Sequence, residues 1–199
     1  DLDGVLIDSK KNMQLSWQEL TKKHKIKIPF KDYFSLIGAP FFKILEKLNI
    51  DNSSYKAIER DYKKITTKNM KLIKMHAGVK ETINILKLKK KYVGILTSKE
   101  RSRTLKILKK YNIKVDVVLC PYQNLIGKPN PKQINDLSKK KKIPKNQIVF
   151  IGDMKIDKLT AKNAKIDYIH AKYGYSTKLK SKYSINKINN IIINNLGIS

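Results

Sequence analysis

From about residue 79 onward, apolar positions follow two alternating patterns. Apolar residues three or four positions apart predict helices, with stripes at Val79, Ile83 and Leu86, at Leu105, Leu108 and Tyr111, and at Ile134 and Leu137. Short apolar runs predict strands at 92–96, 115–120, 147–153 and 167–171. Two more helices are predicted over 158–166 and over 184–196, the latter from Ile185, Ile188, Ile192 and Leu196. Alternating strands and helices predict an α/β fold, with a parallel sheet covered by helices on both faces.

The segment 10–75 follows a different pattern, with three helical stripes and no convincing strand. The stripes contain Met13, Trp17 and Leu20, then Phe41, Ile44, Leu45 and Leu48, then Tyr55, Ile58, Tyr62 and Ile65. The aromatic residues are expected in contacts between helices. A connection of this length is far longer than an ordinary loop and implies a small domain of its own. We therefore expect a core domain of residues 1–9 and 76–199 and an inserted helical domain of residues 10–75.

The net charge of +28 raises the question of an anionic macromolecular partner. Only three of the 44 basic residues are arginine, namely Arg60, Arg101 and Arg103. Proteins that read nucleic acid rely on arginine for bidentate contacts, and no aromatic residues alternate with the lysine runs 89–91 and 139–142 to stack bases. Lysine, isoleucine and asparagine share AT-rich codons, so genome composition explains the charge more simply. We expect no nucleic-acid partner.

Two further features bear on the compartment. The single cysteine, Cys120, excludes an internal disulfide and is expected as a buried residue at a strand end. No apolar run reaches the roughly 20 residues that a membrane helix needs. We therefore expect a cytoplasmic protein without a membrane partner.

Reactive side chains follow the ends of the predicted strands. They are Asp1 and Asp3 at the start, Thr97 and Ser98 after 92–96, Lys128 in the loop after 115–120, and Asp153 and Asp157 at and after the end of 147–153. Ligands of open parallel sheets bind beyond the carboxyl ends of the strands, so these side chains are expected to converge. Such a set suits phosphoryl transfer. One carboxylate attacks phosphorus, and a second one, two residues later on the same side of an extended strand, exchanges protons. Hydroxyl and ammonium groups hold the phosphoryl oxygens.

Four short motifs resemble, in order and spacing, the four signature motifs of the haloacid dehalogenase-like hydrolase superfamily. They are DLDGVLIDS (1–9), GILTSK (94–99), GKPNP (127–131) and IGDMKIDKLTAKNA (151–164). The resemblance covers essentially the whole chain and implies a Rossmann-like parallel sheet core with an inserted helical cap domain. In this family a buried strand precedes the first aspartate. The first strand is therefore expected to be largely missing here, the chain to be a fragment, and an added upstream apolar segment to raise the melting temperature.

The resemblance also implies a role for each motif residue. Asp1 is the expected nucleophile and Asp3 the general acid/base, while Thr97 binds phosphate and Lys128 neutralises charge. The implied cofactor is Mg²⁺, with expected ligands Asp1, Asp3 through its backbone carbonyl, Asp153, and Asp157 as a ligand or as support. Contacts with phosphate or substrate are expected from Gly4, Gly38, Thr97, Ser98 and Lys128. Taken singly, Asp153 could be a helix N-cap and Lys128 a solvated loop charge. The four motifs together favour the catalytic roles.

The aspartate at position 3 narrows the chemistry. Family members that cleave carbon–halogen bonds lack an acid there, and those that cleave carbon–phosphorus bonds typically carry a small residue, so a phosphate ester is expected. LIGAPFFKIL (36–45) and KYGYS (172–176) resemble the phosphoglycolate phosphatase-like branch, although a plain turn before a helix is the other interpretation of Gly38. Lys99 and Arg101 could contact an acidic substrate or cap a helix, and neither is assigned a role.

Three functional hypotheses follow. The first is a Mg²⁺-dependent phosphatase that acts on a small phosphorylated metabolite, phosphoglycolate-like in type, through an aspartyl phosphate. The second is a β-phosphoglucomutase-like mutase, which would return the phosphoryl group to a sugar and would need a bisphosphate primer. The third is a non-enzymatic scaffold that binds polyanions. The charge of +28 motivates this last hypothesis, and the intact set of motif residues opposes it.

Overall fold

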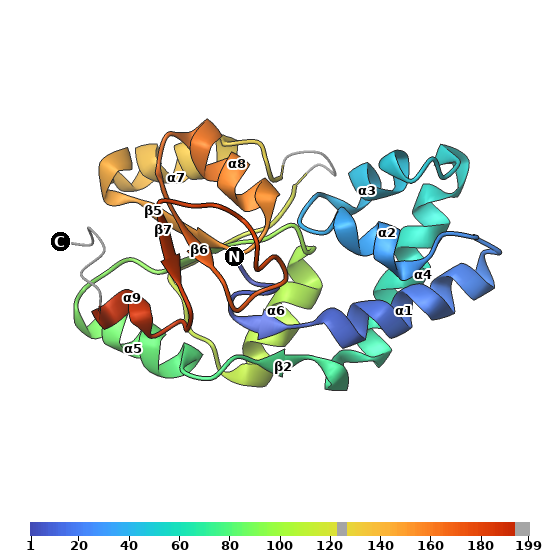
Figure 1. Cartoon of the computed structure of the whole chain (residues 1–199), viewed down its shortest axis with the longest axis horizontal. Coiled ribbons are helices and arrows are strands. Elements are labelled where there is room, and N and C mark those ends of the chain that lie inside the picture. The colour runs from blue at the N-terminus through green and yellow to red at the C-terminus, as the bar shows by residue number, and fades with distance from the viewer. Residues whose placement is uncertain (123–126, 194–199) are drawn as a thin grey trace.

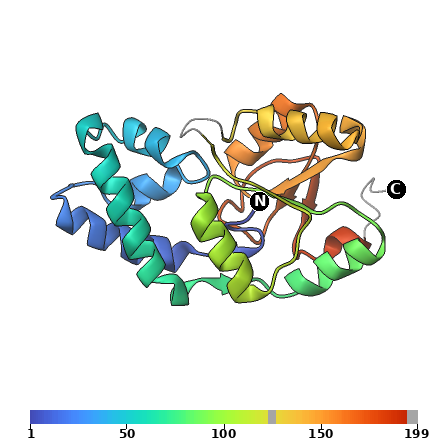
Figure 2. The ribbon, with the colours of Figure 1, turned by 180° about the vertical axis from the view of Figure 1, so that it is seen from behind.

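The computed structural model describes residues 1–122 and 127–193. Figure 1 shows two parts, one with strands flanked by helices and one made of helices only. Helix α6 (Arg101–Tyr111) lies between the two parts in both views (Figures 1 and 2). Residue 1 lies in the same central region, so the DLDGVLIDS segment begins where the two parts meet.

Among the described residues, the first part contains five strands in two parallel sheets, and all but the last of them lie in predicted strands. They are β3 (Gly94–Leu96) paired with β4 (Val117–Leu119), and β5 (Val149–Gly152), β6 (Asp167–Ala171) and β7 (Tyr183–Ile185) in the order β5-β6-β7. Besides α6, the helices of this part are α5 (Val79–Leu88), α7 (Lys132–Lys141), α8 (Lys155–Ala164) and α9 (Asn190–Ile193). In Figure 1, α7 and α8 lie on one side of the strands and α5 and α9 on the other. The α/β class with parallel strands is confirmed.

The start of the chain is anchored in the apolar core of this part. Leu2 and Ile7 are fully buried in a cluster that also contains Val79, Ile107 and Ile169. Side chains of an extended segment alternate in direction, so burying Leu2 turns its two neighbours away from the core. This alternation directs the two aspartates of the first motif toward the gap between the two parts.

The second part, which we call the helical block, spans residues 10–72. Its helices are α1 (Lys10–Lys23), α2 (Phe30–Ser35), α3 (Phe41–Lys47) and α4 (Tyr55–Lys68), with 3₁₀ turns at 52–54 and 70–72. The predicted stripes are buried in a separate apolar cluster, in which the Trp17 and Tyr33 rings stack with centroids 4.2 Å apart. The Trp17 indole also donates a hydrogen bond to the Ile28 carbonyl at 2.9 Å. The exact division of the chain into two domains stays a prediction.

The prediction that residues 10–75 contain no strand is wrong at the end of that range. Lys74 and Met75 form β2, which pairs antiparallel with β1 (Ile7–Asp8). These two segments are the ones by which the chain enters and leaves the helical block. Their pairing closes the base of the insertion. It joins residues far apart in sequence, so no local sequence pattern predicts it.

The predicted helix over 184–196 is also wrong at its beginning. Ser184 and Ile185 lie in β7, where Ile185 pairs with Ala171 of β6. Ile185 is 2% exposed, so extending the sheet places a β-branched side chain in the core. A short helix follows only at α9, and Leu196 lies outside the described residues.

Candidate functional site

Lys128 joins carboxylates from two distant motifs. Its ammonium nitrogen lies 2.8 Å from Asp1 Oδ1 and 2.7 Å from Asp157 Oδ1. The lysine side chain is 1% exposed, and the two aspartate side chains are 5% and 0% exposed. Removing an ammonium group from water costs several kcal/mol unless partners compensate its charge. The interpretation of Lys128 as a solvated loop charge is therefore wrong.

Asp157 is held in place by the beginning of α8. Its Oδ2 accepts hydrogen bonds from the backbone N–H groups of Asp153 at 3.2 Å and Met154 at 2.9 Å, while Oδ1 accepts from Lys128. Met154, and not Asp153, precedes the first helical residue, so the N-cap interpretation of Asp153 is wrong. Both oxygens of Asp157 accept hydrogen bonds, so this carboxylate orients the Lys128 ammonium group and the backbone of the motif, and it also belongs to the carboxylate cluster described below.

Asp153 is the carboxylate with the least compensation. It is fully buried, and its Oδ2 accepts a hydrogen bond from the Tyr175 backbone N–H at 2.6 Å. Its Oδ1 is buried and has no hydrogen-bond partner among the described residues. Burial, followed by the negative charge of Asp157, raises the pKa of Asp153. A cation at this oxygen would supply the missing compensation.

Two glycines allow Asp153 to occupy this position. A Cβ on Gly4, whose φ is +85°, would lie 2.1 Å from Asp153 Oδ2, and a Cβ on Gly174 would lie 2.3 Å from the Asp153 Cβ. The space beside both backbones is therefore filled by the aspartate. Gly4 does not line the pocket described below, so its contact with phosphate stays a prediction.

The three carboxylates fit a divalent cation. One oxygen each of Asp1, Asp153 and Asp157 can be chosen so that all three lie within 4.8 Å of one another. Carboxylate oxygens are the ligands that Mg²⁺ prefers. The unpartnered oxygen of Asp153 provides an independent reason to place a cation here.

Asp3 lies beside this cluster and has its own partners. Its Oδ1 accepts a hydrogen bond from Ser9 Oγ and lies 3.2 Å from the ammonium nitrogen of Lys99. Ser9 is fully buried and contacts the Tyr175 hydroxyl through both its backbone N–H and its Oγ. Lys99, which the sequence left without a role, is therefore part of the site, whereas Arg101 binds the Val118 carbonyl away from it.

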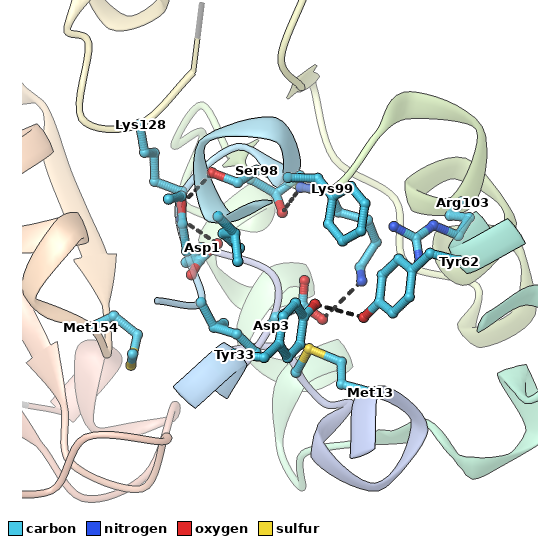
Figure 3. Close-up of a pocket in the computed structure, with 16 residues that line it drawn as sticks. Asp1, Asp3, Met13, Tyr33, Tyr62, Ser98, Lys99, Arg103, Lys128 and Met154 are labelled. Atoms are coloured by element: carbon cyan, nitrogen blue, oxygen red, sulfur yellow. Dashed lines mark hydrogen bonds and ion pairs between the residues drawn. The ribbon is translucent and has the colours of Figure 1, made fainter. Parts of the chain in front are cut away.

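A small cavity of about 60 Å³ opens between the two parts of the molecule (Figure 3). The core part contributes the charged and polar side chains of Asp1, Asp3, Thr97, Ser98, Lys99, Arg103 and Lys128. The helical block contributes an apolar and aromatic wall that includes Met13, Tyr33, Phe41, Ile44 and Tyr62. The cavity therefore has one charged wall and one largely apolar wall.

The second motif connects the two walls. Thr97 is 1% exposed, and its hydroxyl accepts a hydrogen bond from the Lys99 backbone N–H at 3.2 Å. Ser98 Oγ donates a hydrogen bond to the Gly38 carbonyl, which belongs to the helical block. Gly38 adopts φ of +98° and lines the cavity, and its contact with substrate stays a prediction.

Several residues that shape the site belong to none of the four sequence motifs. Tyr33 and Tyr62 share a hydrogen bond between their hydroxyls at 2.7 Å. Arg103 donates hydrogen bonds to Thr66 Oγ1 and to Glu100 and lies over the Tyr62 ring. The spacing of Lys99 and Arg103, four residues apart at the start of a predicted helix after a strand, was the available signal for the two cations.

Comparison with known families gives a match over residues 1–171 to the model described as haloacid dehalogenase-like hydrolase. A search of curated proteins gave no match. None of the helices in residues 1–122 and 127–193 combines the length and apolar character that a membrane crossing requires.

Three solved structures illustrate the likeness in fold. A protein assigned as a haloacid dehalogenase-like hydrolase from Bacteroides fragilis matches with a TM-score of 0.86 at 19% identity, over 96% of each chain. One assigned as a phosphoglycolate phosphatase from Lactobacillus plantarum gives 0.86 at 19% identity, over 97% of this chain and 95% of the other. A predicted phosphoglycolate phosphatase from Haemophilus somnus gives 0.80 at 21% identity, over 97% and 94%.

Proposed function

The chain belongs to the haloacid dehalogenase-like hydrolase family, and we propose that it is a Mg²⁺-dependent phosphatase of small organic phosphate monoesters. The observation that carries the proposal is the buried Lys128, which bridges Asp1 and Asp157 beside the unpartnered oxygen of Asp153. The names of two similar structures favour a phosphoglycolate-like ester as substrate. The single buried cysteine is consistent with a cytoplasmic location.

In the first step, a carboxylate oxygen of Asp1 attacks phosphorus and the bond from phosphorus to the leaving oxygen breaks. Asp3 donates its proton to that oxygen, so the product leaves as an alcohol. Lys128 lies against Asp1 and keeps positive charge beside the phosphoryl oxygens, where negative charge must be held. Thr97 and Ser98 also line the cavity and carry hydroxyl groups that can bind phosphoryl oxygens.

In the second step, water attacks the phosphorus of the aspartyl phosphate. Asp3, now a carboxylate, takes the proton of the water, and the bond between phosphorus and the Asp1 oxygen breaks. Inorganic phosphate is released, and both aspartates return to their starting states. One residue therefore serves as acid and then as base, which requires its carboxyl group to reach both the leaving oxygen and the water.

The residues that would hold Mg²⁺ are Asp1 and Asp153 through their side chains and Asp3 through its backbone carbonyl, with Asp157 as support. When bound, Mg²⁺ neutralises charge on the phosphoryl group and lowers the repulsion between it and the carboxylates. Asp153 would thereby gain the partner that its buried oxygen lacks.

The helical block supplies the wall that excludes water and selects the leaving group. Its aromatic and aliphatic side chains face the carboxylates across the cavity (Figure 3). Exclusion of bulk water strengthens the electrostatic interactions inside the site. The small volume, about 60 Å³, favours a leaving group of a few atoms.

The test is release of inorganic phosphate from a panel of small esters, including phosphoglycolate, with Mg²⁺ and with EDTA. We expect release that needs Mg²⁺ and is lost in Asp1→Asn. The matched control is Asp167→Asn, an exposed aspartate at the opposite end of a core strand, which should retain activity. Release that persists in Asp1→Asn would contradict the proposal. Consumption of a sugar phosphate without phosphate release, dependent on a bisphosphate primer, would indicate a mutase instead.

A further inference from the structure

Lys99 is buried in a chain whose lysines are mostly at the surface. Its side chain is 8% exposed, whereas six other lysines that form ion pairs in the described residues have side chains at least 39% exposed. Among the buried lysines, Lys128 has two carboxylate partners within 2.8 Å, but Lys99 pairs with Asp3 alone among the described residues. Burying an ammonium group costs free energy, so the buried position of Lys99 indicates a role other than that of a surface charge.

Lys99 is the cation that reaches Asp3. Arg103 also lines the cavity, but it donates hydrogen bonds to Glu100 and to Thr66 and packs on the Tyr62 ring. The other groups that face Asp3 across the cavity are the hydroxyls of Tyr33 and Tyr62, which bond to each other. Figure 3 shows the Lys99 ammonium directed at the Asp3 carboxylate.

Among the described residues, the hydrogen bond and the ion pair of the Asp3 side chain both involve Oδ1. Oδ1 receives the Ser9 hydroxyl and the Lys99 ammonium. The Ser9 hydroxyl is free to donate because the Tyr175 hydroxyl, which accepts from the Ser9 backbone N–H, can in turn donate to Ser9 Oγ. An oxygen that accepts from two donors is a poor place for a proton, so the proton is carried by the other oxygen, Oδ2.

We propose that Lys99 is a positioning residue which, together with Ser9, fixes the rotation of the Asp3 carboxyl group so that Oδ2 delivers and recovers the proton. This inference rests on the proposed phosphatase function. In the first step the Oδ2 proton moves to the leaving oxygen as its bond to phosphorus breaks and the bond from Asp1 to phosphorus forms. In the second step Oδ2 recovers a proton from the attacking water as the bond between Asp1 and phosphorus breaks.

A pair of nearly equal-sized substrates isolates this role. Ethyl phosphate releases an alkoxide, which needs a proton, whereas acetyl phosphate releases a carboxylate, which does not. Both leaving groups lack a second charge and suit a small cavity. The quantity to compare is kcat/KM, because it reports the steps up to formation of the phosphorylated enzyme.

For Lys99→Met, which keeps the length of the side chain without its charge, we expect kcat/KM for ethyl phosphate to fall at least about tenfold, against less than about threefold for acetyl phosphate. Lys99→Arg should restore most of the loss, because it again donates to Oδ1. Ser9→Ala removes the other donor to Oδ1. It should reduce the ratio of kcat/KM for ethyl phosphate to kcat/KM for acetyl phosphate by a smaller factor than Lys99→Met does. In the Asp3→Asn background, Lys99→Met should cause no further loss with ethyl phosphate.

Lys132→Met is the matched control, since Lys132 is 50% exposed and pairs with Asp136 away from the cavity. It should leave both rates unchanged. Equal losses of kcat/KM for ethyl phosphate and acetyl phosphate in Lys99→Met would overturn the inference. It would also be overturned if Lys99→Met lowered kcat/KM for ethyl phosphate by the same factor in the Asp3→Asn background as in the unmodified protein. A loss confined to the KM of phosphoglycolate would also overturn it, because it would show direct binding of an anionic leaving group. Failure of the unmodified protein to hydrolyse any ester would instead contradict the proposed function.

Discussion

The two walls of the cavity differ in what holds them in place. On the core side, charged groups hold one another: Lys128 contacts Asp1 and Asp157, and Lys99 contacts Asp3. On the side of the helical block, packing dominates, with Phe41 stacked on Tyr62 at a centroid distance of 4.7 Å. The core wall thus presents paired charges to the cavity, and the other wall presents packed rings and aliphatic side chains. In the proposed function the first wall holds the phosphoryl group and the second contacts the leaving group. Variants on the two walls should therefore fail in different ways.

The largest expected effect is on the core wall. Lys128→Met leaves Asp1, Asp153 and Asp157 together without their shared cation, so the free energy of unfolding should fall by about 3–5 kcal/mol. Urea denaturation in EDTA measures the change. Lys132→Met removes an exposed ion pair and should cost no more than about 1 kcal/mol. Equal decreases in the free energy of unfolding for the two substitutions would show that Lys128 does not stabilise the buried carboxylates.

The next effect concerns the cation. Mg²⁺ at about a hundred times its dissociation constant should stabilise the protein by about 2.7 kcal/mol, because it binds only the folded site. Asp153→Asn should abolish this gain, since Asp153 carries the unpartnered oxygen. Thermal unfolding with and without Mg²⁺ gives the comparison. A melting temperature that still rises with Mg²⁺ in Asp153→Asn would place the cation elsewhere.

A substitution on the wall of the helical block should change which phosphate ester is preferred as substrate and leave the phosphoryl transfer steps intact. Phe41→Ala enlarges the cavity, so the ratio of kcat/KM for phenyl phosphate to that for phosphoglycolate should rise about tenfold. The dependence on Mg²⁺ should be unchanged. A parallel fall for both substrates, with the ratio constant, would mean that this wall does not select the leaving group.

The smallest expected effect lies within the helical block, away from the cavity. Hydrogen bonds from Lys23 and then His24 lower the pKa of Asp61 from 3.8 to about 2. A carboxyl group with a lowered pKa in the folded state stabilises the protein above its unfolded pKa and loses that contribution as the pH falls. The difference in melting temperature between the unmodified protein and Asp61→Asn should therefore be full above about pH 4 and shrink toward pH 2. A difference that does not vary with pH would contradict this assignment.

Much of the fold could be predicted because its signals are local. The strands at β3, β4, β5 and β6 are short apolar runs, and the stripe through Met13, Trp17 and Leu20 marks α1 without any knowledge of its partners. The short helix α2 and the strands β2 and β7 could not be predicted in this way. Each depends on a partner far away in sequence, as when Ile7 pairs with Met75.

The same distinction applies to the candidate site. Asp153 directly follows β5, Asp157 lies in the first turn of α8, and Lys128 lies in the connection after β4. The topology of a parallel sheet therefore accounts for how they meet Asp1. The sequence could not predict which side chains the packing of the helical block would place in the cavity. The Tyr33–Tyr62 pair looks like any helix contact in sequence, and its place in the cavity follows from how the helical block docks.

The central claim is that the phosphoryl group is transferred to Asp1, and trapping the acyl phosphate tests it most directly. Protein quenched during turnover of a small ester with Mg²⁺ would be reduced with borohydride, digested and sequenced by mass spectrometry. Reduction of an aspartyl phosphate converts the residue to homoserine, and we predict homoserine at position 1 only. Turnover without any homoserine, or homoserine at position 3, would contradict the account.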